Sequence, residues 1–137
     1  MKAALILALV TAFASAQSNE TPVYVEQFTN LLASMDRISA ECANASSNRD
    51  ERIAISERLF ALTKVAHRLQ EQVGEVNSEI IRRGKRPDKR LRLIELGAMS
   101  IDSAVTSMGS YLETDDKLFW IIAVDFRKTA DTIKKGL

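Results

Sequence analysis

Three stretches of the chain repeat apolar residues in alternating steps of three and four. The first stretch lies within residues 24–45, the second within 55–80 and the third within 91–112. A mean spacing of about 3.5 residues keeps the apolar side chains on one side of a helix, where they face a partner helix. The pattern predicts an all-α chain without a sheet. The three stripes are Tyr24, Phe28, Leu31, Met35, Ile38, Cys42 and Ala45; Ile55, Leu59, Leu62, Ala66, Leu69, Val73, Val76 and Ile80; and Leu91, Ile94, Ala98, Ile101, Val105, Met108 and Leu112.

Capping and turn residues divide the chain into four expected helices, over roughly 22–44, 49–84, 87–113 and 115–135. We expect Thr21 to cap the first helix with Pro22 in its first turn, and Ser47 or Asn48 to cap the second. The fourth has Thr114 or Asp115 as its expected cap. Short connections between four helices predict an antiparallel up-down-up-down four-helix bundle. A long coiled coil of two or three helices is the alternative.

The N-terminus has the pattern of a secretory signal peptide. Lys2 precedes an apolar stretch over residues 3–12, and Ala14-Ser15-Ala16 fits the A-x-A cleavage pattern. We therefore expect a signal peptide over residues 1–16 and a single helical domain over 17–137, with no transmembrane segment in the mature chain. An uncleaved anchor is the alternative. A single cysteine favours the bacterial periplasm over disulfide-rich animal secretion, so the expected location is periplasmic or secreted.

Composition argues against several kinds of function. Removal of Lys2 leaves as many basic as acidic residues, which disfavours a basic nucleic-acid binder. His67 is the only histidine, so one chain cannot build a di-iron carboxylate site or a zinc site with three or four His and Cys ligands. We expect His67 to point away from the core and Cys42 to be buried. No phosphate loop or nucleophile elbow is present, and we expect neither an enzyme nor a cofactor.

A cluster of cations surrounds the expected turn between the second and third helices. In an up-down-up-down bundle this turn and both termini share one end, and the acidic residues Asp50, Glu51, Glu113, Asp115 and Asp116 lie at the other. Such a basic pole would suit anionic headgroups, lipopolysaccharide phosphates or an acidic protein. The alternative is a solvated tip that complements helix dipoles. The pole consists of Arg82, Arg83, Lys85, Arg86, Lys89, Arg90 and Arg92, joined by Lys134 and Lys135.

The last two helices carry more apolar and small residues than one stripe requires. With Phe119, Ile122, Phe126, Ala130 and Ile133 facing inward, helix geometry turns Trp120, Ile121 and Val124 outward. These three would form an interface with a second copy or a partner, unless neighbouring helices wrap the fourth helix. The third helix adds a stripe that favours close helix packing over a ligand groove: Leu93, Gly97, Ser100, Ala104, Ser107 and Tyr111.

The functional expectation is an exported non-enzymatic interaction protein that binds a protein or an anionic envelope component. A helical-bundle carrier of a small molecule or haem is one alternative, because Met35, Met99 and Met108 could join His67 as axial ligands. An enzyme with an unrecognised site is the other.

Overall fold

The computed structural model describes the backbone of residues 2–137 and the side chains from Glu20 onward. Four helices account for most of this part of the chain: α1 (Lys2–Ala43), α2 (Arg49–Arg82), α3 (Lys89–Thr114) and α4 (Lys117–Lys135). Residues 2–137 contain no strand, which confirms the all-α prediction. From Glu20 onward, no helix combines the length and apolar character needed to cross a membrane.

The second and third helices begin and end close to the predicted positions. Asn48 caps α2, and its side-chain oxygen accepts hydrogen bonds from the backbone N–H groups of Asp50 (2.9 Å) and Glu51 (3.3 Å). At the other end Gly84 adopts φ +73°, the left-handed conformation that glycine tolerates best. Both predictions for α2 are therefore confirmed.

Two predicted helix starts are wrong. α1 begins at Lys2, and Pro22 lies inside it, so Thr21 does not cap a helix. The cap of α4 is Asp116, because Asp115 is occupied as the left-handed C-terminal cap of α3 (φ 58°). The predicted signal peptide, residues 1–16, lies outside the residues whose side chains are described, and its cleavage stays a prediction.

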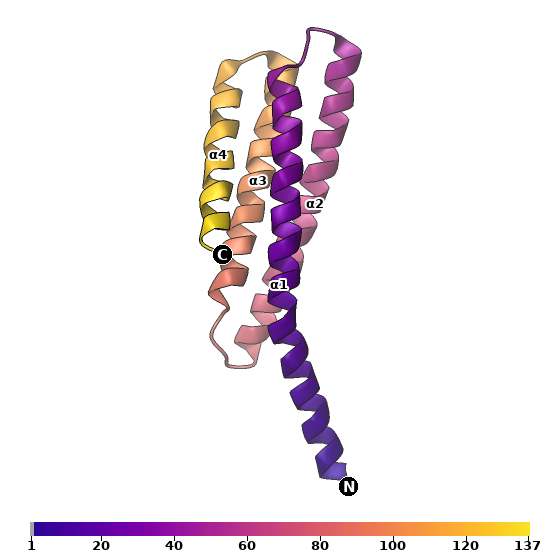
Figure 1. Cartoon of the computed structure of the whole chain (residues 1–137), viewed down its shortest axis with the longest axis vertical. Helices are drawn as coiled ribbons and strands as arrows, with labels where there is room; N and C mark the ends of the chain where they lie inside the picture. Colours follow the sequence, from indigo (N-terminus) through magenta and orange to yellow (C-terminus); the bar gives the residue numbers. More distant parts are fainter. Residues whose placement is uncertain (1) are drawn as a thin grey trace.

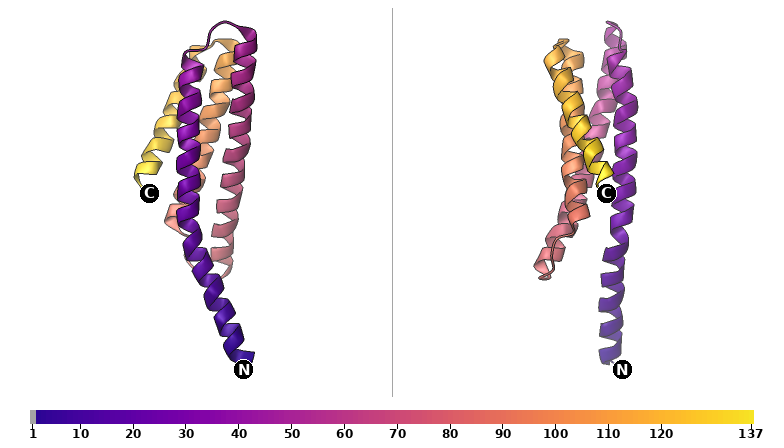
Figure 2. Two further views of the ribbon diagram at one scale, coloured as in Figure 1. Left: turned by 45° about the vertical axis from the view of Figure 1, so that its right-hand side comes forward. Right: turned by 60° about the vertical axis from the view of Figure 1, so that its left-hand side comes forward.

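The helices pack side by side as an elongated bundle. The α1–α2 and α3–α4 connections lie at one end, and the α2–α3 turn lies at the other (Figure 1). α3 contacts all three other helices, most extensively α2 and α4, whereas α2 and α4 do not meet within the described residues. α1 packs lengthwise against both α2 and α3, as the turned views show (Figure 2).

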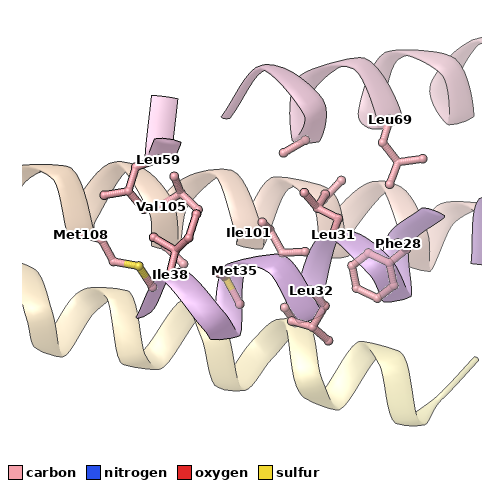
Figure 3. Packing of buried hydrophobic residues seen from close by; sticks show 14 of the residues in the cluster. Phe28, Leu31, Leu32, Met35, Ile38, Leu59, Leu69, Ile101, Val105 and Met108 are labelled. Carbon is pink, nitrogen blue, oxygen red and sulfur yellow. The ribbon is translucent and has the colours of Figure 1, made fainter. Parts of the chain in front are cut away.

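The predicted stripes form the core. Every member of the third stripe is buried, and large α1 side chains such as Phe28 and Met35 fill the space between the other helices (Figure 3). Gly97 is required here, because an added Cβ would lie 2.5 Å from the Phe28 ring. The small-residue stripe of α3 therefore serves close packing, as predicted.

Candidate functional site

The α2–α3 turn is held open to solvent by a compact helix ending. The backbone N–H of Lys85 donates to the carbonyl of Ile80 (3.1 Å), and that of Gly84 donates to Ile81 (2.9 Å). This is the Schellman pattern, in which a left-handed residue satisfies the last carbonyls of a helix. It ends α2 sharply and leaves residues 81–87 exposed.

All seven predicted turn cations are exposed, and they fall into two groups. Three have acidic partners: Arg82 (3.1 Å) and Arg83 (3.0 Å) pair with Glu79, and Arg92 pairs with Glu95 (2.8 Å). The other four form no ion pair with any residue from Glu20 onward: Lys85, Arg86, Lys89 and Arg90. The turn therefore presents four uncompensated positive charges.

The one acidic residue within the turn is occupied by structural bonds. Asp88 caps α3 by accepting a hydrogen bond from the backbone N–H of Arg90 (2.8 Å), and its other carboxylate oxygen accepts one from Thr21 (3.1 Å). The Asp88 backbone N–H donates to the buried Asn77 side chain (3.3 Å). Asp88 thus joins α1, α2 and α3 and makes no side-chain ion pair with the turn cations.

Three of the turn cations stand where a helix disfavours positive charge. Lys89, Arg90 and Arg92 lie in the first turn of α3, next to the positive end of the helix dipole. The first turn of α3 contains no acidic residue, whereas that of α2 contains Asp50 and Glu51. Helix stability therefore does not account for this arrangement.

The two C-terminal lysines of the predicted basic pole do not lie at the turn. Lys134 and Lys135 are exposed in the last turn of α4. α4 is the shortest helix, and its C-terminal end lies beside α3, before the level of the α2–α3 turn (Figure 1). The last turn of α4 therefore points toward the α2–α3 end of the bundle but stops short of the turn itself (Figure 1).

The orientation of α4 differs from the prediction. Ala130 is buried and Ile133 packs against the core, as predicted, but the other fully buried residue is Ala123. Phe119 and Ile122 are half-buried at the flank, and Phe126 is 38 % exposed.

The three residues predicted to face outward, Trp120, Ile121 and Val124, differ in how exposed they are. Trp120 packs against the core and stacks at a tilt on Tyr111, with ring centroids 5.4 Å apart. Val124 is half-buried, and Ile121 alone is strongly exposed, at 57 %. Leu118, at 58 %, is the exposed neighbour that sequence reasoning missed.

His67 has a partner that the sequence did not reveal. Its Nε2 lies 3.0 Å from Asp102 Oδ2 on α3, and the other Asp102 carboxylate oxygen is buried without a hydrogen-bond partner. Glu95 lies beside Gly74 in the same register, seven residues after His67 on α2 and seven before Asp102 on α3. No serine hydroxyl bonds to His67 among the described residues, so the pair lacks the nucleophile of a hydrolase triad.

Potential metal ligands are scattered over the part of the chain that the structure describes. No group of three or more His, Cys, Asp or Glu side chains converges among the described residues. Met35 and Met108 are buried in the core (Figure 3), whereas Met99, like His67, is exposed. Cys42 is buried as predicted, and burial raises the pKa of its thiol to about 11.

Open grooves lie between helices, and two of them can be described here by their linings. The larger, of about 660 Å³, runs between the start of α2 and the end of α3, and Arg52 on its wall is bound to Asp115 and the Leu112 carbonyl. The other, of about 460 Å³, lies between α1 and α2 over Leu31 and Leu69. The larger groove is lined mainly by polar side chains, such as Arg49, Glu57 and Glu113, and the other includes Gln27, Asn30 and Gln72.

Comparison with known proteins identifies no relative. No family model, curated protein or solved structure matches the chain.

Proposed function

We propose that the chain is an exported, non-enzymatic binding protein whose α2–α3 turn attaches to an anionic surface. In this proposal residues 1–16 are removed as a signal peptide, and residues 17–137 work as an antiparallel up-down-up-down bundle in the periplasm or outside the cell. The observation that carries the proposal is a group of four cations at the turn that form no ion pair with the side chains described from Glu20 onward: Lys85, Arg86, Lys89 and Arg90.

Two features favour a binding role over simple solvation. The only acid in the turn, Asp88, is committed to capping α3 and to Thr21. Lys89 and Arg90 also oppose the dipole of α3, so they contribute nothing favourable to that helix end. A cluster of exposed cations attracts phosphate-bearing surfaces by about 1 kcal/mol per residue.

Vesicle binding tests the proposal. The purified chain should bind vesicles that contain phosphatidylglycerol, or lipopolysaccharide, and should dissociate as salt is raised. Changing Arg86, Lys89 and Arg90 to serine should abolish most of this binding with little loss of stability, because exposed charges contribute little to folding.

A matched control separates position from net charge. Changing Arg49, Lys64 and Arg68 to serine removes the same charge from exposed positions outside the turn. This variant should keep most of the binding. Equal losses in both variants, or no wild-type binding at low salt, would contradict a site at the turn.

A further inference from the structure

The outer face of α4 carries apolar residues that no helix covers. Leu118 and Ile121 are each more than half exposed, and they lie on the side of α4 opposite the buried Ala123 and Ala130. α4 packs mainly on α3, meets α1 only sparsely and does not contact α2 within the described residues. Exposed apolar side chains within a charged rim are typical of contact surfaces.

The charges around Ile121 are arranged in a self-complementary way. Lys117 lies four residues before Ile121, and Asp125 lies four residues after it. Both are exposed, and neither forms an ion pair with any residue from Glu20 onward. One helical turn therefore separates Ile121 from an unpaired positive charge on one side and an unpaired negative charge on the other.

We infer that α4 pairs with α4 of a second copy of this chain in antiparallel orientation, with Ile121 at the twofold axis. In this register each Lys117 reaches the level of Asp125 of the second copy, so one interface gains two symmetric ion pairs. A twofold dimer uses the same patch on both subunits, so the patch must be complementary to itself. An apolar residue with a cation four positions before it and an acid four positions after it meets this requirement.

Sedimentation of charge-reversal variants tests the register. The purified chain should dimerise reversibly, and Ile121→Ser should make it monomeric. Lys117→Asp or Asp125→Lys alone would place like charges together at both symmetric contacts, and each should raise the dimer dissociation constant about tenfold. The double variant K117D/D125K exchanges the charges and should restore the wild-type constant.

A control variant tests whether the effect depends on where the charge is changed. Asp131→Lys changes the charge of α4 by the same amount at an exposed position outside the patch, and it should leave dimerisation unchanged. Circular dichroism should show full helicity in every variant, since the altered side chains are exposed. A wild type that stays monomeric at high concentration would overturn the inference, and so would single variants that have no effect or that the double variant does not rescue.

Discussion

The two ends of the bundle use charge in opposite ways. At the end with the α1–α2 and α3–α4 connections, Arg52 donates to the carbonyls of Ser46 (2.8 Å) and Leu112 (2.8 Å) and pairs with Asp115 (2.7 Å). This single side chain joins both connections. At the α2–α3 turn, four cations have no such partner from Glu20 onward. Arg52 at the first end therefore stabilises the fold, whereas these four cations at the second end stay exposed to solvent.

The largest expected effect is at the paired end. Arg52→Ala would leave the Leu112 carbonyl and Asp115 without their donor, and the Arg52 side chain is only 19 % exposed. Charge-assisted hydrogen bonds contribute about 1.5–3 kcal/mol, so we expect a loss of about 2–3 kcal/mol in the free energy of unfolding. Denaturant titration measures it. A loss below that of a typical surface substitution would contradict the assigned role of Arg52.

Charge reversal at the turn should act in the other direction. Lys89→Glu with Arg90→Glu places acids in the first turn of α3, where the dipole favours them by about 0.3–1 kcal/mol each. We expect the double variant to unfold at a higher temperature than the wild type while losing its affinity for anionic vesicles. Thermal unfolding at low salt checks the gain. A lower unfolding temperature would mean that these cations stabilise the fold.

A smaller effect is expected at Cys42, close to the paired end. Burial, and secondarily the charge of Glu41, raise the pKa of the Cys42 thiol to about 11 in the folded protein. The unfolded thiol ionises first as pH rises from about 9, so the unfolded state gains stability between that pH and 11. Folding stability should therefore fall over this interval. A Cys42→Ser variant controls for other titrating groups and should show a shallower decline.

The smallest expected effect is on the rate at which an alkylating reagent labels Cys42. A buried thiol that is protonated at neutral pH reacts slowly with alkylating reagents. Labelling of Cys42 should be slow in the wild type and faster in Arg52→Ala, because this variant loses the Arg52 bonds that join the α1–α2 and α3–α4 connections. Labelling in the turn variants should match the wild type. Fast labelling of the wild-type protein would show that Cys42 is accessible.

The sequence predicted the core better than it predicted the surface. The third stripe is buried throughout, because heptad spacing and helix geometry determine which side of a long helix faces its partners. α4 was misoriented because its large apolar residues were assumed to face inward. Ala130 is buried as predicted, but the other buried position of α4 is the small residue Ala123, which was not predicted to face inward.

The candidate sites show the same limit. The cluster of turn cations was visible in the sequence, because its members are neighbours along the chain. Their division into paired and unpaired groups depends on rotamers, and the occupation of Asp88 depends on Thr21, 67 residues away. The His67–Asp102 contact depends on the register between two helices. Such contacts follow from packing between elements, which local sequence patterns do not encode.

The position of α3 also has a consequence for how the chain reaches its native state. Its two most extensive partners, α2 and α4, directly precede and follow it in the sequence. Most contacts between helices therefore join helices that are connected by a short loop. Short loops cost little chain entropy, and helical proteins dominated by local contacts fold rapidly. We therefore expect α2, α3 and α4 to assemble early and α1 to dock late. Backbone amides of α1 should then be the first to exchange with deuterium through partial opening, ahead of those in the middle of α3.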